Sequence, residues 1–113
     1  MGRGMLSTIY AKPAPSATVA VTREMVEGVW AKAYGDSPFV NVATGDQLPD
    51  SAHVRGTNCC LMAVRMDERT GRLIILSTID NLAKGASTQA VQNMNIMMGW
   101  DQGESLDLAP LYP

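Results

Sequence analysis

The residues best suited to bind a ligand stand where an apolar run ends and a helical pattern begins. Asp80 and Asn81 follow the apolar run 73–79, and Lys84 and Gly85 lead into residues that repeat at helical spacing. A helix N-terminus carries unpaired N–H groups and the positive end of the helix dipole, which favour an anion such as a phosphate. The Asn81 amide has both a donor and an acceptor, which matches an amide ligand, and Gly85 allows close approach to the backbone. These residue types predict a ligand-binding turn, although a simple helix-capping turn has a similar composition.

Other reactive residue types are few and isolated. His53 is the only histidine, and Asp50 is its nearest acid in sequence, so a surface position is favoured over a catalytic one. Cys59 and Cys60 are adjacent. Without nearby histidines they make a poor zinc site, and buried structural thiols are favoured over a redox switch. The sequence has no phosphate-loop, nucleophile-elbow or zinc-helix motif, so neither a catalytic residue nor a metal site is predicted.

Composition restricts the class of protein. The 113 residues suffice for one domain, and 46% hydrophobic with 18% charged residues is typical of a folded chain. A net charge of −2 gives no basic surface for nucleic acid. No apolar run approaches the roughly 20 residues that span a bilayer, and two adjacent cysteines do not form a secreted disulfide framework. We therefore expect a cytoplasmic protein that binds neither nucleic acid nor membrane.

The elements that would position the turn follow from local patterns. Alternating or continuous apolar runs predict strands, with a hairpin around the loop 67–71 and Gly71 at a positive φ. These strands cover residues 5–10, 39–42, 61–66 and 73–79, with a further extended piece over 53–58. Helical spacing predicts two helices, 22–34 with Thr22 as N-cap and Gly35 as a left-handed stop, and 86–99 with a broad apolar face. The sum is an α+β fold with a mixed or antiparallel sheet of four to five strands covered by helices.

Several runs of the sequence resemble one enzyme family. Residues 79–95 contain Asp-Asn-Leu-Ala-Lys-Gly-Ala and Ala-Val-Gln-Asn-Met-Asn, and are similar to the C-terminal signature of N-acetyl-γ-glutamyl-phosphate reductases. Residues 3–11 resemble the strand after that family's catalytic histidine segment, and 54–58 resemble its Val-x-Gly-(Ser/Thr)-Asn piece. Residues 67–73 look like its hairpin loop, and 109–113 look like its C-terminus. The resemblance spans nearly the whole chain in the order of the family.

The resemblance implies an enzyme that reduces N-acetylglutamyl 5-phosphate with NADPH to the 5-semialdehyde in arginine biosynthesis, as a homo-oligomer. The family is similar to aspartate-semialdehyde and glyceraldehyde-3-phosphate dehydrogenases, which implies part of a C-terminal domain like theirs. In those relatives the residue matching Asn81 holds the nicotinamide carboxamide. The resemblance therefore implies NADP contacts at Asn81, Lys84 and Gly85, and makes Arg3 a candidate contact of the substrate phosphate.

The resemblance also implies what this chain lacks. The family's dinucleotide-binding domain, nucleophilic cysteine and catalytic histidine lie upstream of the matching region, and Cys59, Cys60 and His53 do not match them. We expect 1–80 to be part of the substrate and subunit-contact domain. We expect 81–113 to supply the nicotinamide-side turn, a helix returning to the dinucleotide-binding domain, and a tail. On this interpretation the isolated chain is inactive. The alternatives are a non-catalytic assembly module of the same descent and a fragment of an aspartate-semialdehyde dehydrogenase.

Overall fold

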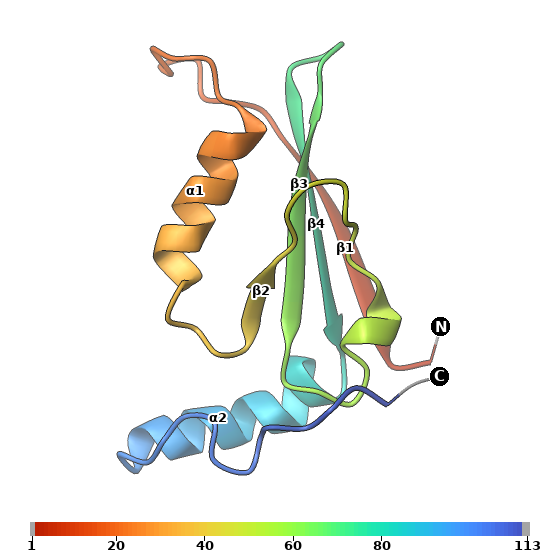
Figure 1. Ribbon diagram of the computed structural model, residues 1–113, viewed down its shortest axis with the longest axis vertical. Coiled ribbons are helices and arrows are strands. Elements are labelled where there is room, and N and C mark those ends of the chain that lie inside the picture. Colours follow the sequence, from red (N-terminus) through yellow and green to blue (C-terminus); the bar gives the residue numbers. More distant parts are fainter. Residues whose placement is uncertain (1, 112–113) are drawn as a thin grey trace.

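A sheet forms the centre of the computed structural model, which describes residues 2–111 (Figure 1). Its strands are β1 (Gly4–Ala11), β2 (Val40–Val42), β3 (Cys60–Asp67) and β4 (Arg72–Asp80), and its helices are α1 (Arg23–Tyr34) and α2 (Thr88–Met97). The order across the sheet is β1-β4-β3-β2. Both β1 and β3 run antiparallel to β4, whereas β2 runs parallel to β3. The predicted α+β class with a mixed sheet is confirmed.

The β3–β4 hairpin forms where the sequence predicts it. Asp67 pairs with Arg72 across the turn, and Gly71 has a φ of +65°, which a glycine adopts without steric cost. The Asp67 carboxylate accepts hydrogen bonds from the Thr70 hydroxyl at 2.5 Å and the Arg69 N–H at 3.1 Å. Local side-chain chemistry therefore closes this turn.

Helix α1 begins as predicted and ends differently. The Thr22 hydroxyl accepts a hydrogen bond from the Met25 N–H at 3.3 Å, which confirms the N-cap. The prediction of a left-handed stop at Gly35 is wrong, because its φ of −56° and ψ of −32° are right-handed. A Cβ atom at Gly35 would lie 2.7 Å from the Ala31 carbonyl oxygen. Close approach within the last turn, rather than a positive φ, is what requires glycine here.

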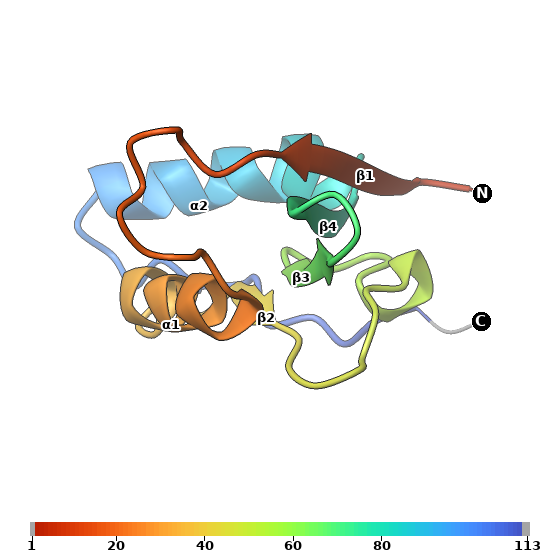
Figure 2. The same ribbon diagram turned by 90° about the horizontal axis from the view of Figure 1, so that it is seen from above.

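Different segments of the chain pack against the two faces of the sheet. Helix α1 lies beside β2 and β3 on one side, and segment 43–58 crosses the other side (Figures 1 and 2). Arg65 of β3 attaches this segment by donating from Nη2 to the Gln47 carbonyl oxygen at 2.7 Å. Within the segment, η1 (Ser51–His53) is a turn of 3-10 helix, where the sequence predicts an extended piece from residue 53.

Strand β1 is an edge strand, and its apolar side chains are partly exposed on both faces. Met5 and Ile9 point to one face and Leu6 and Tyr10 to the other, because side chains alternate along a strand. All four are between 42% and 64% exposed. The apolar surface of β1 is therefore available to another partner on either side.

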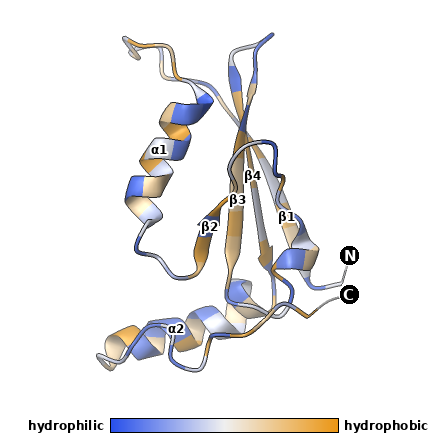
Figure 3. Cartoon of the chain, in the orientation of Figure 1, coloured by the Kyte–Doolittle hydropathy of each residue, from blue (hydrophilic) through white to orange (hydrophobic). Residues whose placement is uncertain are grey.

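The core is small and centres on β3. Ala63 and Val64 are fully buried, and hydrophobic residues follow β3 and β4 along their length (Figure 3). Six further apolar side chains are buried around them: Phe39, Ala43, Val54, Leu73, Ala83 and Leu106.

Helix α2 turns polar side chains toward the rest of the chain. A π-helical turn, η2 (Ala83–Ser87), precedes it, so the helical segment begins earlier than the predicted residue 86, and Gly99 ends it with a φ of +72°. The buried residues of α2 are Gln92 and Asn95. Most of the predicted apolar face is solvent-exposed here, with Met97 85% exposed and Val91 half-buried. None of the helices within 2–111 is long and apolar enough to cross a lipid bilayer.

Candidate functional site

The turn after β4 brings two of the predicted site residues together. The pairing of β1 with β4 places Gly4 opposite Asp80, so Arg3 lies beside Asn81. The Asn81 N–H donates to the Arg3 carbonyl oxygen at 2.8 Å. Arg3 has a φ of +65°, an unusual conformation for a residue with a Cβ atom. The start of β1 and the end of β4 thus form one unit.

Asp80 is the buried centre of this unit. Its side chain is 0% exposed. One carboxylate oxygen, Oδ1, accepts from the N–H groups of Leu82 and Ala83 at 2.8 and 3.0 Å. The other, Oδ2, accepts from the Gly56 N–H at 2.7 Å and lies 3.1 Å from Nε of Arg3. In the sequence Asp80 stands in the predicted ligand-binding turn, but its residue type and position gave it no role of its own.

These donors control the ionisation of Asp80. Burial by itself would raise the pKa of the Asp80 carboxyl, because it penalises the charged form. The hydrogen bonds from Gly56, Ala83 and Leu82, together with the Arg3 charge, outweigh burial and hold the pKa below its ordinary value. The group is therefore a carboxylate near neutral pH.

Asn81 differs from Asp80 because its side chain is at the surface. It is exposed, whereas its backbone N–H is bound by Arg3. A Cβ atom at Gly85 would lie 3.2 Å from Oδ1 of Asn81 and 3.3 Å from a methyl carbon of Ile79. The absence of a side chain at Gly85 therefore leaves the room that the Asn81 amide occupies.

Lys84 is directed into the chain. Its Nζ donates to Oε1 of Gln92 at 2.8 Å and lies 5.5 Å from the centre of the Phe39 ring. Burial lowers the pKa of Lys84, because it penalises the charged ammonium. The three residues predicted to contact a cofactor therefore differ: Asn81 and Gly85 are exposed, and Lys84 makes internal contacts.

A polar network below the turn was not recognised in the sequence. The Asn58 side chain, 0% exposed, donates to Oε1 of Gln92 at 2.8 Å and accepts from the Thr88 hydroxyl at 2.7 Å. Gln92 in turn donates to Oε1 of Gln102 at 2.9 Å. Asn58 lies 34 positions before Gln92, so spacing along the chain gave no signal of this contact.

The remaining candidates lie apart from this network's hydrogen bonds. His53 is exposed at the end of η1. Cys59 and Cys60 are half-buried rather than fully buried as expected, and the Cys60 Sγ lies 3.5 Å from the Ser77 hydroxyl. Among residues 2–111, no group of three His, Cys, Asp or Glu side chains could hold a metal ion.

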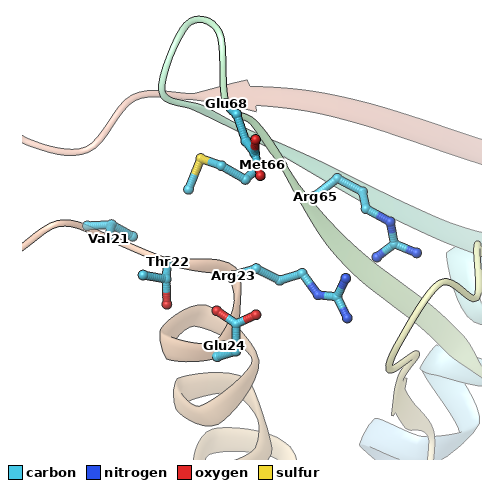
Figure 4. Close-up of a pocket in the computed structure, with 7 residues that line it drawn as sticks. All are labelled: Val21, Thr22, Arg23, Glu24, Arg65, Met66 and Glu68. Carbon is cyan, nitrogen blue, oxygen red and sulfur yellow. The ribbon is translucent and has the colours of Figure 1, made fainter.

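A hollow lies at the opposite end of the sheet. It has a volume of about 370 Å³ and lies between the start of α1 and the end of β3 (Figure 4). Its charged residues are of both signs, and Arg23 already pairs with Glu27 at 2.8 Å. Arg65 is held by two carbonyl oxygens, those of Val64 and Gln47. The turn at Asp80 has the better-organised polar groups, so we regard the turn as the candidate site.

Comparison with known proteins identifies relatives of the whole chain. A protein of Geobacter sulfurreducens is 51% identical over all 113 residues, and one of Geobacillus sp. strain WCH70 is 47% identical over the same length. A protein of Magnetococcus marinus is 47% identical over 98% of the chain. Each is named N-acetyl-gamma-glutamyl-phosphate reductase. The chain spans 31% to 32% of the length of these relatives.

A family model matches most of the chain. It is described as the dimerisation domain of semialdehyde dehydrogenases, and it covers residues 1–81. The matched region includes all four strands and ends at Asn81. The chain therefore belongs to the semialdehyde dehydrogenase family and carries its dimerisation domain.

Proposed function

We propose that this chain is the C-terminal part of an NADP-dependent N-acetyl-γ-glutamyl-phosphate reductase. The enzyme would reduce N-acetylglutamyl 5-phosphate to N-acetylglutamate 5-semialdehyde, with release of phosphate, in the arginine pathway of the cytoplasm. Relatives with that enzyme name match the full chain at 44% to 51% identity. The two cysteines are free and half-buried, which fits a reducing compartment.

The observation that carries this proposal is the arrangement of Asn81. Its amide is exposed, its backbone is bound to Arg3, and Gly85 leaves space beside it. An exposed amide on a fixed backbone can donate to and accept from another amide. This fits the carboxamide of a nicotinamide ring, which carries the same two functions.

The bound NADPH would supply the hydride, and this chain would supply orientation. Asn81 would hold the carboxamide so that one face of the ring meets the substrate. Arg3 uses Nε at Asp80 and remains 40% exposed, so its outer nitrogens can reach a substrate phosphate. The nucleophilic cysteine and the acid–base histidine would come from the remainder of the enzyme.

The open strand β1 fits the dimerisation role of the family. Its four exposed apolar side chains, Met5, Leu6, Ile9 and Tyr10, lie on a rigid strand paired along its length with β4. Buried apolar area is the main source of stability in permanent subunit contacts. We propose that a second subunit covers part of this surface.

The test is a reductase chimera, in which this chain replaces the matching third of the Geobacter sulfurreducens relative. We expect the chimera to reduce N-acetylglutamyl phosphate with NADPH, and the isolated chain to show no phosphate-dependent reduction of NADP. Asn81→Ala in the chimera should lower kcat/KM for NADPH by roughly tenfold, because one or two hydrogen bonds are lost.

The matched control is Asn93→Ala, since Asn93 is an exposed amide on α2 that accepts a hydrogen bond from the Gln89 side chain at 2.9 Å. This variant should retain the cofactor kinetics of the chimera. An inactive but folded chimera, or an Asn81→Ala chimera with unchanged cofactor kinetics, would refute the proposal.

A second candidate is a non-catalytic assembly module of the same descent. Three exposed methionines favour it, Met94 and Met97 on α2 and Met98 at its C-cap, because flexible apolar side chains gathered on one surface suit a protein contact. An inactive chimera together with strong self-association of the chain would favour this candidate over the reductase.

A further inference from the structure

The buried carboxylate of Asp80 requires a physical explanation. A charge removed from water carries a large desolvation cost, which is offset only if its oxygens are well bonded. Asp80 is 0% exposed at the end of a largely apolar strand. Its two oxygens are bonded to three backbone N–H groups and one guanidinium, and these come from three separate segments.

The two oxygens have different structural effects. Oδ1 binds the N–H groups of Leu82 and Ala83, which are the two residues directly after Asn81. Oδ2 binds Gly56 and Arg3, and Arg3 also accepts the N–H of Asn81 through its carbonyl oxygen. The backbone of Asn81 is thereby held both at its own N–H and at the residues that follow it.

We propose that Asp80 is a positioning residue that orients the Asn81 amide toward the nicotinamide by holding the backbone on both sides of it. This inference rests on the proposed function of Asn81. An error of about 1 Å in the placement of a reactant can cost roughly 100-fold in rate, so the holding bonds affect hydride transfer. An asparagine at position 80 cannot replace the carboxylate. Its NH₂ group would face either the N–H groups of Leu82 and Ala83 or those of Gly56 and Arg3, and a donor cannot bind a donor.

A double-mutant cycle in the reductase chimera tests the proposal. The four proteins are the parent, Asp80→Asn, Asn81→Ala, and the two changes together. Because Asp80 acts through Asn81, we expect Asp80→Asn to lower kcat/KM for NADPH by no more than the roughly tenfold loss of Asn81→Ala, when both are measured at saturating N-acetylglutamyl phosphate. The double variant should be no worse than the worse single variant.

The outcomes separate the two proposals. Losses that multiply in the double variant would show that Asp80 acts independently of Asn81 and would overturn the positioning role. The positioning role would also be overturned if the Asp80→Asn chimera had the cofactor kinetics of the parent while the Asn81→Ala chimera was impaired. An unimpaired Asn81→Ala chimera would instead refute the proposed function itself.

Two further variants keep the test decisive. Asp36→Asn removes an exposed carboxylate from the loop after α1, and should leave all kinetic constants unchanged. If Asp80→Asn does not fold, the cycle is repeated with Arg3→Met, which removes the one side-chain partner of Asp80 and leaves its three backbone donors. The NADPH kinetics of Arg3→Met are measured at saturating N-acetylglutamyl phosphate, so that weaker binding of the substrate phosphate does not enter. A smaller loss for NADPH that disappears in the Asn81→Ala background would then support positioning, and an additive loss would overturn it.

Discussion

At the scale of single residues, Asp80 and Asn81 are neighbours with opposite surroundings. Asp80 is fully buried, whereas Asn81 is exposed. Successive side chains at the end of a strand point to opposite sides, so one can be enclosed while the next reaches solvent. The carboxylate holds the backbone, and the amide remains available for a ligand.

The ionisation of Asp80 predicts a dependence of stability on acid pH. Its folded pKa lies below the ordinary value of 3.8, so its bonds contribute fully above that value and are lost as pH falls through the folded pKa. Asp80→Asn should lower the free energy of unfolding by about 2 kcal/mol at neutral pH. The difference from the parent should shrink below about pH 4. Urea unfolding of the 113-residue chain, followed by circular dichroism at several pH values, measures this.

Asp36→Asn is the control for the loss of one negative charge. Asp36 is exposed, so its replacement should change stability by no more than about 0.5 kcal/mol. If the free energies of unfolding of the parent and Asp80→Asn differed by the same amount at neutral and acid pH, the link between the ionisation of Asp80 and stability would be contradicted.

The sequence predicts part of the site for local reasons. Asn81 and Gly85 stand out because a strand end followed by a helix start is visible in composition. The direction of Lys84 could not be predicted, because its partner Gln92 lies across a turn of unusual π-helical geometry. The partnership of Asn58 with Gln92 depends on the folded topology, and no periodicity reports it.

At the scale of elements, local chemistry decides which predictions succeed. The hairpin and the start of α1 can be predicted because each depends on a local feature. Gly71 adopts the positive φ of the hairpin turn, and Thr22 caps the N–H of Met25, three residues away. The burial of Gln92 and Asn95 on α2 is not predicted from the sequence. Apolar periodicity identifies the face that carries Met97, but it does not show which face of the helix packs against the rest of this chain. Periodicity identifies a helix but not its neighbour.

Strand β1 leads to a prediction about assembly. If a second subunit covers β1, an arginine at Ile9 places a charge in that contact and weakens it, because the charge loses water without gaining a partner. We expect Ile9→Arg to raise the dissociation constant of the dimer by at least roughly 100-fold. Sedimentation velocity over a range of protein concentrations measures it.

Val29→Arg is the matched control, since Val29 is 66% exposed on α1, away from the strand, and receives the same new charge. It should dimerise like the parent chain. Equal dimerisation of both variants would exclude β1 from the contact.

At the scale of the whole molecule, the sheet order joins distant parts of the chain. Strand β1 pairs with β4, and the Thr78 hydroxyl donates to the Met5 carbonyl oxygen across 73 positions of sequence. The β3–β4 pairing, in contrast, is closed by a short turn. The molecule therefore combines one very local and one very distant strand pairing.

This contrast sets an order of folding. Closing a long loop costs more conformational entropy than closing a short one, so β3 and β4 should pair first and β1 should join last. Pulse-labelled hydrogen exchange during refolding should protect the amides of β3 and β4 before those of β1, and simultaneous protection would contradict this order. During synthesis on the ribosome, the distance in sequence between β1 and β4 delays their pairing. At roughly 5–20 residues per second, β1 waits several seconds for its partner strand, with its apolar side chains uncovered.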